Sequence, residues 1–233
     1  MKKAVVLLSG GLDSATILAI AKIEKFNCYA LSFLYGQRHK IELKSAEKLA
    51  KFFEVIEHKI VEINLKNFSN SSLTSNIKVP KNKISLDKFI IDPIKIPNTY
   101  VPARNTLFLS YALAYAEVIG SSNIFIGVNA LDYSNYPDSR PKYIEAFNEM
   151  ANLATKSAIN GKKIKIHAPL INMTKSEIVL TGIELGVNYD DTHSCYDPDG
   201  KFACGECDSC VLRKRGFQDA GIEDKTKYKY SKK

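Results

Sequence analysis

Short apolar runs alternate along the first part of the chain with segments whose apolar residues recur every three or four positions. The runs 5–8, 28–34 and 55–63 predict three strands, and the periodic segments 14–23 and 40–53 predict helices between them. Cys28, inside the second run, is interpreted as a buried small hydrophobe. This order of elements is typical of a parallel sheet with helices packed on its faces.

The second half of the chain continues the same alternation. Helices are expected over 105–119 and 141–159, and strands over 123–128 and 164–167. The segment 105–119 carries apolar residues on most faces, so a largely buried helix is predicted there. Together with the first half, the pattern predicts an α/β protein with five strands.

Capping signals mark three helix ends. Asn105 is predicted as the N-cap of the buried helix and Gly120 as the residue beyond its end. The sequence Thr-Lys-Ser-Glu over 174–177 matches a capping box and predicts a further helix that begins there.

Residues 64–97 interrupt the alternation, being rich in Asn, Ser and Lys. A long irregular stretch inside a domain is usually functional or disordered, so we interpret it as a mobile insertion beside the site, able to act as a lid. The expected organisation is a nucleotide-binding α/β domain over 1–190, a metal-binding segment over 191–217 and a basic tail over 218–233.

Composition restricts the class of protein. The 233 residues are 45% hydrophobic and 25% charged, as in an ordinary globular protein, and no apolar stretch is long enough to span a bilayer. The apolar run after Met1 is too short for a signal peptide, so we expect a cytoplasmic protein without a membrane partner. Part of the net charge of +8 lies in a basic cluster near the C-terminus, made of Arg213, Lys214, Arg215, Lys225, Lys227, Lys229, Lys232 and Lys233. Because these basic residues lack interleaved aromatics, we interpret them as solvated and expect no nucleic-acid partner.

The first predicted strand leads directly into SGGLDSAT, residues 9–16. Two glycines allow a tight turn and close approach to a ligand, and the following helix N-terminus favours an anion. The motif is neither a Walker loop nor Gly-x-Gly-x-x-Gly. It resembles the signature of the N-type PP-loop ATP pyrophosphatases, so a nucleotide site is favoured over a turn without a ligand.

Four cysteines lie within sixteen residues near the C-terminus, at positions 195, 204, 207 and 210. The spacing Cys-x8-Cys-x2-Cys-x2-Cys allows four thiolates to surround one ion, which closes a tetrahedral structural site. Structural zinc is favoured, and an iron–sulfur cluster is the alternative. Disulfides are disfavoured in a cytoplasmic chain.

Polar residues also gather where predicted strands end. Arg104 stands beside a helix start, where a guanidinium can clamp a carboxylate or phosphate. In the loop after the strand 123–128, Asp132 or Asp138 offers a carboxylate to a heterocycle edge, and Tyr133 or Tyr136 offers a stacking surface. An exposed arginine and a merely polar loop are the alternatives.

Six segments in this order resemble one family over almost the full length: SGGLDSAT, LYGQRH, VPARN, GVNALDYSNYPDSRP, PLINMTKSEI and SCYDP with CGECDSC. They are similar to the 7-cyano-7-deazaguanine synthases of queuosine biosynthesis. The resemblance implies an adenine-nucleotide α-hydrolase-like fold with a five-stranded parallel sheet, a homodimer, and one Zn²⁺ per chain on Cys195, Cys204, Cys207 and Cys210. It also implies conversion of 7-carboxy-7-deazaguanine and ammonia to the nitrile with ATP and Mg²⁺.

The resemblance also assigns site residues. The expected catalytic residues are Asp13, Arg104, Asp132 and Lys175. The expected ATP-binding residues are Leu8, Ser9, Gly10, Gly11, Leu12, Asp13, Ser14, Ala15, Thr16, Ile17 and Leu18. The expected substrate-binding residues are Tyr35, Gln37, Arg104, Asp132, Tyr136 and Asp138.

Two other functions remain open at this point. One is a PP-loop enzyme that modifies tRNA by adenylating a base, and the other is a nucleotide-gated zinc-ribbon regulator without turnover. The sequence leaves open whether the nucleotide product is AMP or ADP.

Overall fold

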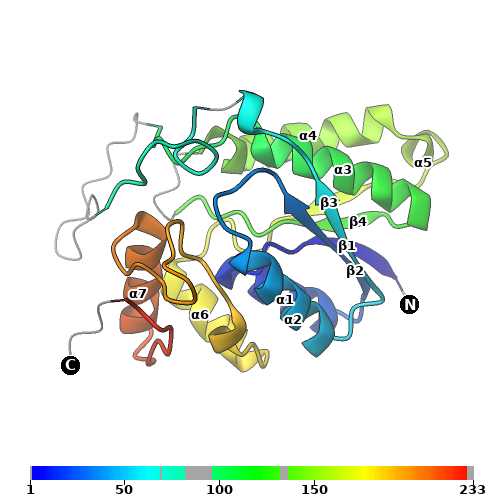
Figure 1. The fold of residues 1–233 in the computed structure, drawn as a ribbon. Coiled ribbons are helices and arrows are strands. Elements are labelled where there is room, and N and C mark those ends of the chain that lie inside the picture. The colour runs from blue at the N-terminus through cyan, green and yellow to red at the C-terminus, as the bar shows by residue number, and fades with distance from the viewer. Residues whose placement is uncertain (1, 69, 82–95, 132–135, 230–233) are drawn as a thin grey trace.

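A parallel sheet forms the centre of the molecule (Figure 1). The computed structural model describes residues 2–68, 70–81, 96–131 and 136–229. Within them the sheet has five strands in the order β3-β2-β1-β4-β5, all pairs parallel, as predicted. The strands are β1 (Lys3–Leu7), β2 (Asn27–Leu34), β3 (Glu57–Glu62), β4 (Asn123–Phe125) and β5 (Lys165–His167).

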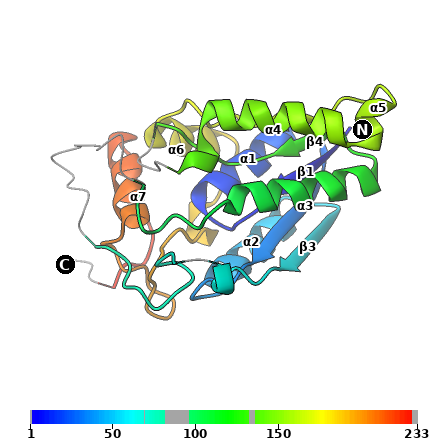
Figure 2. The ribbon, with the colours of Figure 1, turned by 90° about the horizontal axis from the view of Figure 1, so that it is seen from above.

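Helices cover both faces of this sheet (Figures 1 and 2). On one face lie α1 (Leu12–Ile23), α2 (Ile41–Phe52) and α6 (Lys175–Glu184). On the other lie α3 (Arg104–Ile119), α4 (Pro141–Ala154) and α5 (Lys156–Ile159). The helix α7 (Asp208–Asp219) packs beside α6. Short 3-10 helices span Lys66–Phe68, Pro137–Ser139 and Tyr189–Asp191.

Alternating side chains of the central strand enter two separate cores. Val5 and Leu7 of β1 belong to the core under α3 and α4, whereas Ala4 and Val6 belong to the core under α1, α2 and α6. Both faces of β1 are therefore buried, which explains why its sequence is a continuous apolar run. Cys28 is fully buried in the second core, as predicted.

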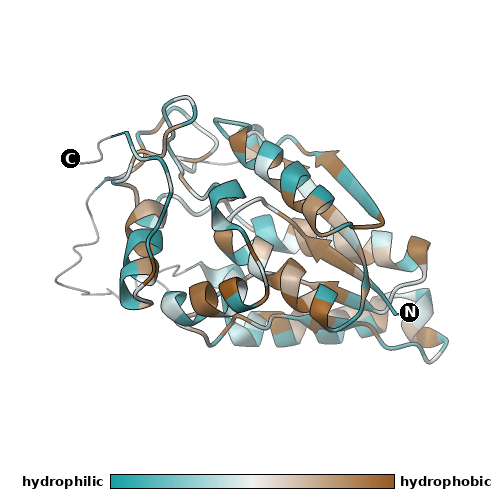
Figure 3. Ribbon diagram, turned by 90° about the horizontal axis from the view of Figure 1, so that it is seen from below, coloured by the Kyte–Doolittle hydropathy of each residue, from teal (hydrophilic) through white to brown (hydrophobic). Residues whose placement is uncertain are grey.

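The charged residues of helices α1 to α6 are absent from the buried set. Figure 3 shows hydrophilic and apolar residues side by side along the helices. Helix α3 is less enclosed than predicted, because the side chain of Val118 is 81% exposed. Within the described parts of the chain, no helix combines the length and the apolar character that crossing a membrane requires.

Two predicted helix boundaries are wrong, each for a local reason. Helix α3 begins at Arg104, so Asn105 is not its N-cap. The Asn105 amide instead donates to the Asp138 carbonyl and to Ser139 Oγ. The predicted helix over 141–159 is interrupted at Thr155, which is extended and whose Oγ1 caps the short helix α5. Gly120 does end α3 in the left-handed conformation, and the Thr174–Glu177 capping box is present, as predicted.

The strand order places a switch point beside β1. The chain passes from β1 outward to β2 and β3, and then crosses to β4 and β5 on the other side. In open α/β sheets ligands bind outside the carboxyl ends of the strands at such a point. The loop over 8–11 begins there, between β1 and α1.

Candidate active site and metal centre

A cavity of about 290 Å³ opens at the carboxyl ends of β1, β2 and β4. The loop over 8–14 forms one part of its wall, and the first turns of α2, α3 and α6 form others. Residues 193–196, which lead into the cysteine segment, complete the wall on the remaining side. The cavity therefore joins the two motifs that the sequence separates by almost the whole chain.

Gly10 allows the loop to lie directly against α2. Its φ of +87° is left-handed, and a Cβ added there would lie 2.0 Å from the backbone oxygen of Glu42. The Gly10 N–H donates to Ser14 Oγ (3.1 Å), and the Ser14 hydroxyl donates to the Gly11 carbonyl (2.9 Å). The loop is thus folded back on itself before any ligand arrives, with the α1 N-terminus facing the cavity.

Residues next to the cysteines fix the same loop from the opposite side. The His193 N–H donates to the Gly10 carbonyl (2.9 Å), and the Leu12 N–H donates to Ser194 Oγ (3.3 Å). Ser209 Oγ, in the first turn of α7, donates to the Ser194 carbonyl (2.6 Å). The loop conformation therefore depends on the cysteine segment as well as on the sheet.

Lys175 and Asp13, both predicted as catalytic, form an ion pair in the cavity wall. Lys175 Nζ lies 2.7 Å and 3.0 Å from the two Asp13 carboxylate oxygens. Gly216 of α7 makes room for this lysine, because a Cβ at Gly216 would lie 2.3 Å from Lys175 Cγ. Helix α7 thus sets the path of the lysine side chain toward the loop.

Arg104 also lines the cavity, from the first turn of α3. Its guanidinium lies 5.6 Å from the centre of the Tyr35 ring, and its Nη1 donates to the Tyr35 hydroxyl at 3.5 Å. No described carboxylate forms an ion pair with this half-buried cation. A cation so placed is suited to an anionic ligand.

The other predicted substrate residues are placed in three ways. Tyr35, Gln37 and Tyr136 line the cavity. Asp138 is buried and is not among the described residues that line the cavity. Its Oδ2 accepts the Asn105 N–H (2.9 Å), one of the N–H groups in the first turn of α3 that have no partner within the helix. Asp132 lies outside the described residues.

Sequence reasoning missed Glu42 as a lining residue. Its Oε1 accepts a hydrogen bond from Gln37 Nε2 (2.9 Å). Burial raises the pKa of Glu42 to about 7, against the opposing effects of the Gln37 hydrogen bond and the Arg104 charge. The sequence signal that could have indicated Glu42 was its position just after LYGQRH, at the start of a helix that follows a strand.

His39 and His193 face each other in the cavity wall, with ring centres 5.8 Å apart. Burial lowers the pKa of both, and that of His193 falls to about 4 with added repulsion from His39 and Arg213. The lowered pKa of each ring favours the neutral imidazole.

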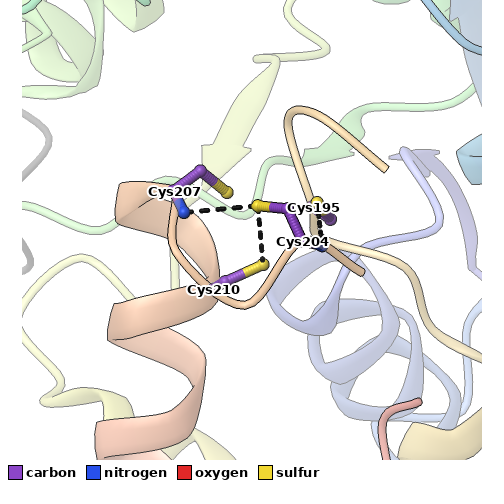
Figure 4. Close-up of side chains that lie close together, drawn as sticks. All are labelled: Cys195, Cys204, Cys207 and Cys210. Carbon is purple, nitrogen blue, oxygen red and sulfur yellow. Dashed lines mark hydrogen bonds between the residues drawn. The ribbon is translucent and has the colours of Figure 1, made fainter. Parts of the chain in front are cut away.

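The four cysteines meet at the start of α7, as Figure 4 shows. Their sulfurs all lie within 4.8 Å of one another, and all four side chains are buried. Four sulfurs bound to one zinc at about 2.3 Å lie about 3.8 Å apart, so the cluster has the size of a metal site. Backbone N–H groups of Asp197 and Cys204 donate to Cys195 Sγ, which suits a thiolate. The chain thus contains a four-sulfur metal site.

The tail holds this segment in place rather than lying fully in solvent. The Ala203 N–H donates to the Lys227 carbonyl (2.9 Å), and the Lys229 N–H donates to the Ala203 carbonyl (2.8 Å). Arg213, grouped above with the solvated basic residues, is 4% exposed and pairs with Asp224 at 3.1 Å. For Arg213 that interpretation is wrong, because its charge is paired inside the segment.

Known proteins similar to this chain identify its family. The family of queuosine biosynthesis protein QueC matches residues 3–221. A 7-cyano-7-deazaguanine synthase from Desulfatibacillum aliphaticivorans is 59% identical over 97% of this chain and 97% of its own length. One from Paramagnetospirillum magneticum is 57% identical over 98% and 99%.

A solved structure supports the fold alone. The NMN synthetase of Francisella tularensis matches with a TM-score of 0.50 and 19% identity over 96% of this chain and 79% of that one. The full-length sequence matches favour the deazaguanine synthases over the tRNA-modifying and regulatory alternatives. This chain belongs to the QueC family, the ATP-dependent 7-cyano-7-deazaguanine synthases of queuosine biosynthesis.

Proposed function

We propose that the cavity converts 7-carboxy-7-deazaguanine and ammonia into 7-cyano-7-deazaguanine in two rounds of ATP-dependent activation. The observation that carries this proposal is the placement of three groups around one cavity: the SGGLDSAT loop, the Lys175–Asp13 pair and the Arg104 guanidinium, which forms no ion pair with a described carboxylate. Together they offer a phosphate site beside a carboxylate site.

The chemistry requires activation because a carboxylate does not lose hydroxide to ammonia. In the first round a carboxylate oxygen attacks the α-phosphorus of ATP and releases pyrophosphate. Ammonia then displaces AMP and loses a proton, which leaves an amide. In the second round the amide oxygen is activated in the same way, and its departure with AMP and loss of two N–H protons leave the nitrile.

The residues divide these tasks by position. The backbone N–H groups at the start of α1 hold the pyrophosphate portion of ATP, and Lys175 offsets charge that develops during transfer. Arg104 holds the substrate carboxylate, while Tyr35 and Tyr136 contact its flat ring. Asp13 offers a carboxylate oxygen for Mg²⁺, which supplies charge neutralisation at the phosphates when bound.

We propose Zn²⁺ as the ion of the four-cysteine site. Four protein sulfurs leave no open coordination position, so the ion would stabilise the segment over 191–217 and take no part in the reaction. An iron–sulfur cluster on the same ligands would give the purified protein a brown colour and visible absorbance. Metal analysis of the purified chain distinguishes the two.

We further propose a cytoplasmic homodimer. An apolar surface at one end of α3 and α4 supports the dimer: the side chains of Val118 and Leu153 are each 81% exposed and that of Ile159 is 77% exposed. The Ser157 N–H donates to Glu117 Oε1, which holds α5 beside the end of α3. We expect V118D/L153D to convert a dimer to a monomer in light scattering, and an unchanged mass would reject this surface.

The test of the reaction is one incubation with ATP, Mg²⁺, ammonium and 7-carboxy-7-deazaguanine, followed by mass spectrometry. We expect the nitrile, and without ammonium no amide or nitrile. Nucleotide chromatography in the same samples separates AMP from ADP, and ADP without AMP would contradict attack at the α-phosphorus. Unchanged substrate from metal-loaded protein that binds ATP would overturn the proposed reaction.

A further inference from the structure

The proposed substrate carries two recognisable ends. One is the carboxylate on the five-membered ring. The other is the edge of the six-membered ring, where N1–H and the 2-amino group present two adjacent donors. A carboxylate accepts both donors together, as it accepts the paired donors of a guanidinium. An acidic side chain in the cavity, away from the group that binds the substrate carboxylate, can therefore select for this ring.

Two acidic side chains stand among the described residues that line the cavity, Asp13 and Glu42. Asp13 is already paired with Lys175 at 2.7 Å. Asp138, which the sequence offered for this edge, instead accepts the Asn105 N–H at the start of α3. Glu42 is therefore the described carboxylate best placed to read the ring.

The surrounding contacts fix Glu42 in the cavity wall. Gln37 Nε2 donates to Glu42 Oε1, and Gln37 is itself held by the Tyr35 N–H (2.7 Å) and the Phe33 carbonyl (3.1 Å). The end of β2 thus positions the carboxylate before a ligand binds. Since Gln37 engages Oε1, the carboxylate keeps further acceptor capacity for a ligand.

Arg104 of α3 and Glu42 of α2 both line the cavity, and both act electrostatically on Tyr35. They influence each other electrostatically, yet no ion pair within 4.0 Å joins these two described side chains. Aromatic rings of Phe33, Tyr35 and Phe108 pack together in the same lining, with Phe33 and Phe108 stacked at 4.0 Å. The lining thus offers a cation, packed aromatic rings and a carboxylate to a ligand in the same cavity.

We propose that Glu42 is the specificity-determining residue that accepts the N1–H and 2-amino hydrogens of the deazaguanine ring. This inference rests on the proposed function and adds the residue that recognises the N1–H and 2-amino edge of the ring. Two N–H donors of the ligand would stabilise the ionised form of Glu42 and lower its pKa. Substrate binding should therefore release a proton from Glu42 near neutral pH. The charged or titratable groups that act on Glu42 are Arg104 of α3 and Tyr35 after β2.

The test compares two ring compounds on two matched variants by calorimetry without ATP. The compounds are 7-carboxy-7-deazaguanine and its analogue without the 2-amino group. Glu42→Gln keeps the size of the side chain and an oxygen for Gln37. Glu47→Gln, an exposed position on the same helix, is the control. Binding of MgATP to each variant is measured in parallel.

We expect wild type and Glu47→Gln to bind the amino compound about tenfold or more tightly than its analogue. Glu42→Gln should bind the amino compound about 10- to 100-fold more weakly, with little change for the analogue or for MgATP. If Glu42→Gln fails to fold, Glu42→Asp should show a smaller loss of the same preference.

Other outcomes overturn the assignment. Equal losses for both ring compounds would give Glu42 a structural role, and a loss confined to MgATP would make it a nucleotide or metal contact. An unchanged preference would also reject it. If wild type binds neither ring compound, the proposed function itself fails and the Glu42 assignment with it.

Discussion

The two sides of the cavity are built by different means. On one side the sheet holds the loop over 8–14, because β1 pairs with both β2 and β4 and Gly10 packs against α2. On the other side residues 193–207 contain no helix or strand, only a short turn and isolated bridges. The sheet side is fixed by the strand ladder, whereas the cysteine side depends on its four cysteines, on α7 and on the tail.

The residues around the metal site contact the residues that line the cavity. A structural ion usually stabilises only the segment that holds its ligands. Here Ser194 and Gly216, one on each side of the four ligands, contact the Leu12 N–H and the Lys175 side chain. Through these contacts the metal centre and the loop over 8–14 form one structural unit.

The largest expected effect lies on the sheet side. Arg104→Ala should lower kcat/KM by about 10²- to 10³-fold, since a charge-stabilising group of the cavity is removed. Arg104→Lys should recover little, because a lysine lacks the bidentate geometry. Arg140→Ala, at an exposed arginine preceding α4, is the matched control in steady-state kinetics. Equal activity of Arg104→Ala and the control would remove Arg104 from the site.

A smaller effect is expected on the cysteine side. In an exposed helix Gly→Ala stabilises by about 1 kcal/mol. Gly216→Ala should instead destabilise the protein and lower kcat about tenfold, because the new Cβ meets Lys175 Cγ and moves the lysine from Asp13.

Urea unfolding and kinetics of Gly216→Ala check this expectation. Gln218→Ala, an exposed position on α7, is the control for helix propensity. A stabilised and fully active Gly216→Ala variant would show that α7 does not position Lys175.

The smallest effect is a pH dependence on the sheet side. The raised pKa of Glu42, about 7, means that the folded protein binds its proton more tightly than the unfolded chain. Its contribution to stability is therefore fully present below the unfolded pKa of about 4.3 and is lost as pH rises to about 7. As pH rises from about 4.3 to about 7, the urea unfolding midpoint of wild type should fall relative to that of Glu42→Gln. If the two midpoints change in parallel with pH, the burial of this carboxyl is contradicted.

The sequence predicted the parts of the molecule that depend on local pattern. Strand and helix order, the capping box at Thr174, the glycine-rich loop and the cysteine cluster all follow from spacing within short segments. Parallel pairing follows from the alternation of strands and helices. The family resemblance placed Lys175 and Asp13 among the expected site residues without showing that they pair.

Contacts between distant segments account for what the sequence missed. Asparagine is a common N-cap residue, which is why Asn105 was predicted to be one. In the structure Asn105 lies inside the first turn of α3, and Asp138 from another loop accepts its N–H. The Leu12 N–H and Ser194 are 182 positions apart, and Gly216 faces Lys175 only because α7 packs on α6. No periodicity or spacing encodes such contacts, because they arise from the way that finished elements pack.

Hydrogen exchange of metal-loaded and chelator-treated protein tests most directly whether the metal centre and the loop over 8–14 form one unit. It is measured by mass spectrometry on peptides covering the loop, β3 and the cysteine segment. We predict faster exchange without metal at residues 193–210 and at residues 9–14, with β3 unchanged. Faster exchange confined to 193–210, with the loop as protected as before, would show that the metal centre is a separate appendage.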